Sequence, residues 1–298
     1  MLGGPESPGN LWWRGLHERA VALTQREQAI LASFRNFGGS ITANFRLGQS
    51  CHSLGEYARA ADVLSRNIAL LEEDLQRELF GFAGFPSVLS RVWLALCEVE
   101  QNRIGEAVRH SGEAVEIADS AEHSFSQVVA LAGQGTIFLL VGDMDAAMPS
   151  LERALAIDRV SDVPLLLPLI APPLGLAYVR AGRHEEGLDL IAQGVERAEI
   201  LEFAANHARR LTWLGEARLL SGQSDVAKRV ALRALEMARR YGERGHEAYA
   251  LSLLGDVMAR GHPPDREGAA TAYRDALTLA ELLGMRRLSA ALFGALQA

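Results

Sequence analysis

Residues 213–227 read Trp-Leu-Gly-Glu-Ala-Arg-Leu-Leu-Ser-Gly-Gln-Ser-Asp-Val-Ala, and this stretch contains the pattern that decides the fold. A small residue, Gly215, stands within an apolar segment, a Ser-Gly turn follows, and a second small residue, Ala227, comes twelve positions later. Glycine permits the left-handed conformation that closes a helix, and the Ser or Asp after it can cap or favourably charge the next helix. The stretch therefore predicts a helical hairpin.

The same marks recur along the chain with a period near 40 residues. The residues equivalent to Gly215 are spaced by 47, 40, 40, 40 and 40 positions, and they are Gly48, Ala95, Gly135, Gly175 and Gly255. The second marks are Ala60, Ala107, Ala147, Gly187 and Ala269, the last of them displaced by two positions. A fixed period of this kind is typical of a solenoid. Because a mid-helix glycine costs about 1 kcal/mol relative to alanine, its recurrence indicates close packing between helices.

These marks resemble the tetratricopeptide repeat (TPR), which combines W-x-x-L-G-x-x-Y in one helix with A-x-x-x-F-x-x-A in the next. The matching fragments are Trp213-Leu214-Gly215, Leu174-Gly175-Leu176-Ala177-Tyr178 and Ala269-Ala270-Thr271-Ala272-Tyr273-Arg274-Asp275-Ala276. The resemblance covers about residues 41–283, although the common TPR unit has about 34 residues. It implies an all-α, right-handed superhelical solenoid of about six hairpins, with ~40-residue repeats and a half-repeat at each end.

The expected organisation is a disordered leader over residues 1–10, followed by a single solenoid domain over residues 11–298. The expected repeats are 11–40 (partial), 41–87, 88–127, 128–167, 168–207, 208–247, 248–285 and 286–298 (partial). The longer spacing of 47 residues comes from the loop Gly81-Phe-Ala-Gly-Phe-Pro. This loop either fills space between repeats or contacts a ligand.

A narrower resemblance involves residues 68–75, 77–91 and 277–288. These segments are similar to the C-terminal TPR region of large bacterial signalling proteins. Such proteins join an adenylate/guanylate cyclase, or a LuxR-type DNA-binding regulator, to a signalling ATPase and then to repeats of this kind. The resemblance implies a sensor or scaffold arm, and no cyclase or ATPase residues match in this chain.

Composition and charge exclude several classes of function. Of 30 Lys+Arg only Lys228 is a lysine, and it lacks the glycine frame of a Walker-A loop. The net charge of −7 arises within residues 1–150, which makes a nucleic-acid partner unexpected. The eight histidines show no metal-ligand spacing and no catalytic triad can be assembled, so we expect no enzyme activity, cofactor or metal.

Two uncharged stretches, Ser124–Gly142 and Val163–Val179, raise the question of a membrane span. Their polar residues, glycines and prolines, and their register with the repeat, favour buried helices and no membrane association. Cys51 and Cys97 lie in apolar, helix-like sequence and are interpreted as buried thiols of a reducing compartment. Since the first residues lack the pattern of a signal peptide, a cytoplasmic location is expected.

In stacked TPR hairpins the first helix of each pair lines the concave surface. The repeat register then predicts a partner-binding groove formed by Phe45, Gln49, His52, Leu89, Val92, Leu96, Val129, Thr136, Leu139, Leu169, Leu176, Arg209, Thr212, Glu216, Tyr249, Ser252 and Asp256. Its middle is apolar and its ends are polar, as expected for a surface that binds a peptide or helix. The alternative is that the superhelix closes tightly and buries this strip as core.

These inferences predict a non-catalytic scaffold in bacterial signalling that binds a protein, peptide or helix in its groove. The alternative is a sensor module for a short peptide or small signal that regulates an upstream ATPase, cyclase or transcription factor. Trp12 and Trp13 place apolar side chains at an end of the solenoid, where caps are usually polar. They predict that the N-terminal end either self-associates or once packed against an upstream domain.

Overall fold

The computed structural model describes residues 4, 6–161, 165–261 and 263–297. Over these residues it contains fifteen α-helices, one 3₁₀ helix and no strand. They are α1 (Pro8–Trp13), α2 (His17–Phe34), α3 (Phe37–Ser53), α4 (Tyr57–Ala69), η1 (Glu73–Arg77), α5 (Pro86–Glu100), α6 (Ile104–Ser120), α7 (Ser124–Val141), α8 (Met144–Ser161), α9 (Leu167–Arg180), α10 (His184–Ile200), α11 (His207–Leu220), α12 (Ser224–Tyr241), α13 (Arg244–Ala259), α14 (Arg266–Leu282) and α15 (Arg286–Gln297).

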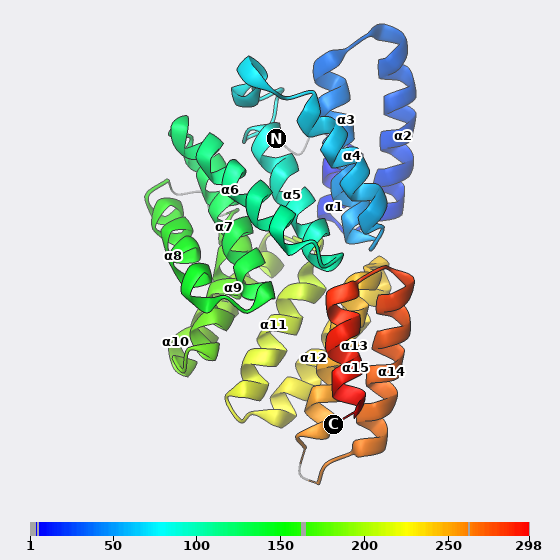
Figure 1. Cartoon of the computed structure of the whole chain (residues 1–298), viewed down its shortest axis with the longest axis vertical. Helices are drawn as coiled ribbons and strands as arrows, with labels where there is room; N and C mark the ends of the chain where they lie inside the picture. The colour runs from blue at the N-terminus through cyan, green and yellow to red at the C-terminus, as the bar shows by residue number, and fades with distance from the viewer. Residues whose placement is uncertain (1–3, 5, 162–164, 262, 298) are drawn as a thin grey trace.

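Twelve of these helices form the six predicted hairpins, from α3–α4 to α13–α14, so the all-α solenoid is confirmed (Figure 1). The short helix α1 with α2 precedes the hairpins, and α15 follows them. The turns between α9 and α10 and between α11 and α12 contain the predicted glycines, Gly182 and Gly222. Their φ angles of 86° and 77° lie in the left-handed region, which glycine adopts readily at the end of a helix.

The recurring small residues permit very close helix packing. In the α9–α10 hairpin Gly175 faces Gly187, and a Cβ on either residue would overlap the carbonyl oxygen of the other. Gly48 and Gly135 meet the side chains of Leu64 and Leu151 in the same way, each on the second helix of its own hairpin. Missing side chains thus let the two helices of a unit approach each other, which offsets the helix cost of glycine.

The superhelix curves until its first and last parts meet. Figure 1 shows α2–α4 and α13–α15 next to each other at the end of the turn. Tyr57 at the start of α4 packs onto Gly245 of α13, and Gly15 lies against the ring of Tyr241. The Tyr249 hydroxyl donates a hydrogen bond to Glu100 across a sequence separation of 149 residues. The solenoid therefore forms a closed turn, with the first helix of each hairpin facing the inside.

The expected leader is wrong at residues 8–10, which form the first turn of α1. Ser7 caps this helix by accepting a hydrogen bond from the backbone N–H of Asn10, and Pro8 occupies the favoured first position. Residues 1–3 and 5 lie outside the described part of the chain.

The two N-terminal tryptophans are packed internally, which is opposite to the expected exposed end. Trp12 is only 5% exposed, and its indole N–H donates to the Ser53 hydroxyl at 3.0 Å. Trp13 stacks on Phe203 with ring centroids 3.8 Å apart and donates to the carbonyl of Leu201. Since both side chains are used to close the superhelix, they do not provide the predicted self-association surface.

The uncharged stretches form helices of the solenoid where they are described. Helix α7 is long and apolar enough to span a membrane, but 56% of it is buried inside the protein. It contacts α5, α6, α8 and α9, as expected of a core helix. The first two residues of the second stretch, 163 and 164, lie outside the described part, and the stretch continues into α9, whose Pro172 and Pro173 do not interrupt the helix. Cys51 and Cys97 are buried free thiols, as predicted.

Replacing Gly175 by alanine should destabilise the fold by about 1–3 kcal/mol, because the new methyl group has no room against the backbone of α10. The matched control is Gly112→Ala in α6, where a Cβ meets nothing within 4 Å. That substitution should stabilise the protein by about 0.5–1 kcal/mol through helix propensity. Urea denaturation followed by circular dichroism measures both effects, and equal effects at the two positions would contradict this account of the repeat.

Candidate functional site

Three adjoining cavities follow the inner surface of the closed superhelix. We call them the aromatic, the central and the charged cavity, with volumes of about 220, 150 and 100 Å³. Each is smaller than the roughly 300–1,000 Å³ of a typical ligand pocket, so a peptide-sized ligand would extend over more than one of them. The aromatic and central cavities share Trp93, Val129 and Leu169 as lining residues, and the central and charged cavities share Leu140, Arg209 and Trp213. The three cavities are therefore neighbours along the inner surface.

The aromatic cavity lies between the N-terminal segment, α3, α5 and the turn that precedes α11. Its lining residues include Trp12, Trp13, Phe45, Arg46, Gln49, Phe82, Leu89, Phe125 and Phe203. The inter-repeat loop contributes Phe82, whose ring meets that of Phe45 edge-on at 5.3 Å. The loop thus fills space against α3 and also borders the cavity, so both interpretations of it stay open.

The central cavity combines apolar walls with buried polar groups. The apolar side is formed by α5 and α7, and the polar side comes from His52, Glu100, Asn206, Arg209, Arg210 and His246. His52 is only 8% exposed, its ring meets Trp93 edge-on at 4.9 Å, and its Nδ1 atom has no hydrogen-bond partner among the described residues. An unpaired buried acceptor or donor beside empty space is available to a ligand.

The charged cavity lies between α9, α11, α13 and α15. Arg180 donates to Glu216 at 2.6 Å, and the Tyr273 hydroxyl donates to Asp256 at 2.7 Å. Arg209 and Arg287 also line this cavity. Arg209 lies over the ring of Tyr249, and Arg287 donates a hydrogen bond to its hydroxyl. The lining therefore carries three arginines and two carboxylates, and both carboxylates accept hydrogen bonds from other side chains of the protein.

The predicted groove residues were placed well by the repeat register. With the exception of Leu176, every one of them lines at least one of the three cavities. Leu176 is wrong: it is fully buried, because α9 is packed against α7, α8, α10 and α11. Several apolar members, such as Val92 and Val129, are less than 9% exposed and yet border empty space. The groove and core interpretations therefore each describe part of this strip.

Other lining residues were not predicted from the sequence. Trp93 and Trp213 lie on helices that were predicted to face inward, but they fall between the positions that the repeat register assigns to the inner surface. Phe203 and Asn206 come from the turn before α11, and they enter the interior because that turn meets the N-terminal segment. The two tryptophans could have been predicted to line the interior, because they are large aromatic residues on helices that face inward. The sequence holds no such signal for the turn residues.

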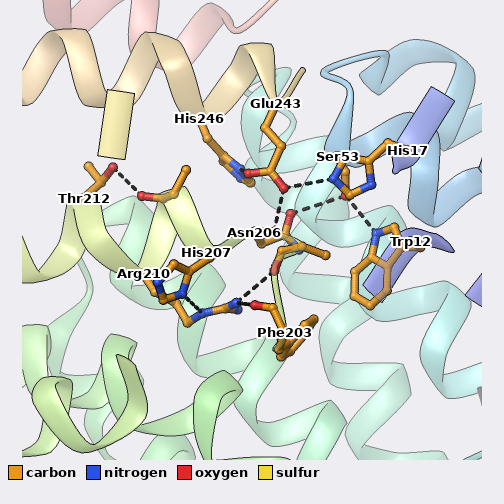
Figure 2. A network of polar contacts seen from close by, with 12 residues as sticks. Trp12, His17, Ser53, Phe203, Asn206, His207, Arg210, Thr212, Glu243 and His246 are labelled. Atoms are coloured by element: carbon orange, nitrogen blue, oxygen red, sulfur yellow. Dashed lines mark hydrogen bonds and ion pairs between the residues drawn. The ribbon is translucent and has the colours of Figure 1, made fainter. Parts of the chain in front are cut away.

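A buried carboxylate joins the two ends of the superhelix (Figure 2). Glu243 is 0% exposed, and its two oxygens lie 3.0 Å from His17 Nε2 and 3.0 Å from His246 Nδ1. The backbone N–H of Asn206 donates to the same carboxylate at 2.7 Å. Burial alone would raise the pKa of Glu243, but the hydrogen bonds from the two histidines outweigh it and lower the pKa to about 2. Glu243 is ionised, so both imidazoles donate to it.

The turn before α11 is fixed by local chemistry as well. Asn206 adopts a left-handed conformation, with φ of 58°, which asparagine tolerates better than most residues. Arg210 is buried and donates to the carbonyls of Phe203 and Ala205 at 2.6 and 2.9 Å, as Figure 2 shows for Phe203. Its role is structural, because these bonds satisfy carbonyls that no helix uses.

Among the described residues, no group of three or more His, Cys, Asp or Glu side chains is arranged to hold a metal ion. No family model and no curated protein matches the chain.

Solved structures, in contrast, match its fold over most of its length. A Rap protein in complex with the competence and sporulation factor shares 14% identity, with a TM-score of 0.68 over 93% of this chain and 75% of its own. The Rap conjugation regulator of plasmid pLS20 in complex with the Phr* peptide shares 10% identity, with a TM-score of 0.73 over 93% and 72%. PlcR of Bacillus thuringiensis, in complex with the peptide PapR7 and DNA, shares 14% identity, with a TM-score of 0.55 over 83% of each chain.

These are TPR-like helical repeat proteins, and the fold of this chain is TPR-like. The similarity concerns the fold and gives no match to the signalling ATPases, cyclases or LuxR-type regulators that the narrower resemblance suggested.

Lowering the pH from 7.5 to 5.0 should destabilise the protein by about 2 kcal/mol for each of two buried histidines. Burial lowers the pKa of His52 from 6.5 to about 3, and burial with the nearby Arg210 charge lowers that of His207 to about 4. As the pH falls below 6.5 the unfolded chain binds these protons and the folded chain does not, so stability is lost. Urea denaturation at both pH values measures the loss.

The substitution His52→Gln should reduce this pH dependence, since it removes one of the two groups. His184→Gln is the matched control, because His184 is exposed at the start of α10. Glu243 does not contribute in this window, because its pKa of about 2 keeps it ionised at pH 5. An unchanged pH dependence in the His52 variant would show that burial does not hold this ring neutral.

Proposed function

We propose that the chain is a non-catalytic binding module that holds a short peptide in the interior of its closed superhelix. The observation that carries the proposal is the row of three neighbouring cavities on the inner surface, apolar at the aromatic end and charged at the other. Peptide sites combine pockets for apolar side chains with polar groups that fix orientation. The TPR-like proteins of similar fold include three solved in complex with a peptide, which supports the same class of ligand.

An extended peptide fits this interior better than a helix. A helix with its side chains is about 10–12 Å wide and needs a continuous cylinder of that width. Here Trp93 lines both the aromatic and the central cavity, and Trp213 lines both the central and the charged cavity, so a large ring lies at each boundary. An extended chain, with side chains alternating in direction, can pass such constrictions and place successive residues in separate cavities.

We further propose that peptide binding serves bacterial signalling, in a cytoplasmic protein, and that the segments 68–75, 77–91 and 277–288 reflect kinship with repeat regions of signalling ATPases. The polar groups of the interior support binding rather than catalysis. Glu243, Asp256 and Glu216 are each engaged by a histidine, tyrosine or arginine of the fold. They act as structural acceptors in this arrangement, and no proton-transfer role is assigned to them.

The interior can be tested with a mixture of random heptapeptides, from which retained peptides are identified by mass spectrometry after rapid gel filtration. Leu96→Glu places a carboxylate in the central cavity at a half-buried position, so it should abolish retention and keep the helical circular dichroism. Leu232→Glu, 49% exposed on α12, is the matched control and should retain peptides as the wild type does.

Leu176→Glu should instead unfold the protein, because it would bury a charge in a fully packed core. If no heptapeptide is retained by the wild-type chain, or if Leu96→Glu retains the same peptides as Leu232→Glu, the proposed function is wrong.

A sensor role is favoured over a passive scaffold by one observation. Asn206 and His246 line the central cavity and also belong to the Glu243 network that joins the two ends. A ligand there contacts groups on both sides of the closure, so it should change the stability of the closed state.

Hydrogen exchange measures this effect. With a retained heptapeptide bound, the amides of α1 and of residues 203–206 should exchange at least about tenfold more slowly, because opening of the ring must then release the ligand. Helix α14 lies on the outside of the last hairpin and is the internal control. Slower exchange confined to the cavity-lining helices α5, α7 and α11, with α1 unchanged, would indicate a scaffold without a sensing role.

A further inference from the structure

Arg209 stands out among the charged side chains of the interior. It lies in the first turn of α11, is only 8% exposed, and lines both the central and the charged cavity. Its guanidinium carbon lies 3.7 Å from the ring centroid of Tyr249 and 5.0 Å from that of Trp213. Two aromatic faces therefore hold a planar cation in a fixed orientation.

Among the described residues, the guanidinium of Arg209 has no anionic partner. Over the residues that the structure describes, no carboxylate oxygen lies within 4.0 Å of it, and no carbonyl accepts a hydrogen bond from it. The neighbouring Arg210, by comparison, is bonded to two backbone carbonyls, and Arg180 is paired with Glu216. No hydrogen bond among the described residues engages the N–H donors of Arg209, and they border the two cavities, so they are available to a ligand there.

A second cation contacts the hydroxyl group of Tyr249. Arg287 of α15 donates to the Tyr249 hydroxyl at 3.1 Å, and its Nε atom is buried without a hydrogen-bond partner. The same hydroxyl donates to Glu100, whose carboxylate is thereby engaged and forms no ion pair with Arg209 or Arg287 within 4.0 Å. Tyr249 thus connects two arginines whose charges no carboxylate of the described residues neutralises by direct contact.

We propose that Arg209, with Arg287, binds a carboxylate of the peptide at the boundary of the central and charged cavities. This assignment rests on the proposed peptide function and names the chemical group that the peptide must present. A single negative charge matches the site, because Glu100 and Asp256 lie in the same lining and disfavour a dianion. Arginine forms paired, charge-assisted hydrogen bonds with a carboxylate, which suits a fixed guanidinium.

Three synthetic heptapeptide mixtures test the proposal with the full chain. The first has free C-terminal carboxylates and lacks Asp and Glu, the second has C-terminal amides and contains Asp and Glu, and the third has C-terminal amides and lacks both. Retention should be at least about tenfold stronger for the first or the second mixture than for the third, since only the third lacks a carboxylate. The first two mixtures distinguish a terminal from a side-chain carboxylate.

The outcomes separate this inference from the proposed function. Equal retention of all three mixtures would overturn the carboxylate site and leave peptide binding intact. No retention of any mixture would overturn both.

Substitutions then assign the site to Arg209. Arg209→Met should remove the preference for carboxylate-bearing mixtures and leave the thermal midpoint unchanged or higher, because it removes an unpaired buried charge. Arg209→Lys keeps the charge but loses the planar stacking, and it should retain part of the preference. Arg274→Met, at an exposed position on α14, is the control for loss of an arginine and should bind as the wild type does.

Arg210→Met provides the structural contrast at the adjacent position, and it should lower the thermal midpoint because two buried carbonyls lose their donor. Full carboxylate preference in Arg209→Met would show that the carboxylate is bound elsewhere. A fall of its thermal midpoint equal to that of Arg210→Met would show that Arg209 is a structural residue. Either result would overturn the proposal.

Discussion

The buried carboxylate of Glu243 is the constraint on which the closed form of this solenoid depends. A TPR-like solenoid has no intrinsic reason to bring its ends together, because each hairpin contacts mainly its neighbours. Here one ionised side chain, with no exposed surface, receives hydrogen bonds from His17, His246 and the backbone of Asn206. Removing one donor would leave a buried charge only partly satisfied, so the three segments are required together.

Closure changes what the concave surface is. In an open solenoid the inner helices would form a groove, and in a tightly wound one they would form a core. In this chain the ends meet while large aromatic side chains such as Trp93, Trp213 and Phe203 keep the inner walls apart, so that cavities persist among otherwise buried residues. The polar groups that close the ring also line the central cavity, as His246 does. Stability and ligand access are consequently coupled through the same atoms.

The sequence predicted those features that repeat every 40 residues. Gly215 and its equivalents located the hairpins, and the register placed Val92, Val129 and Arg209 on the inner surface, because helical period and repeat period together determine which side a residue faces. It failed where a position differs from its equivalents. Leu176 occupies an inner register position but is packed on all sides, since the small residues of α9 and α10 draw those helices unusually close.

The contacts that close the ring could not be predicted for a related reason. His17 and Glu243 are 226 residues apart, and neither belongs to the repeated marks, so their meeting depends on the accumulated curvature of every hairpin between them.

Net charge was a poor guide to the interior. The −7 of residues 1–150 makes a nucleic-acid partner unexpected, but it says nothing about the charges on the inner surface. Surface charges are screened within about 8–10 Å at physiological salt, whereas groups in a buried cavity are screened much less. The electric field inside the cavities is therefore set mainly by the few charges that line them. Arg209 and Arg287 come from the half of the chain with no net charge, and they lack direct carboxylate partners. An acidic protein can in this way present a site that attracts an anion.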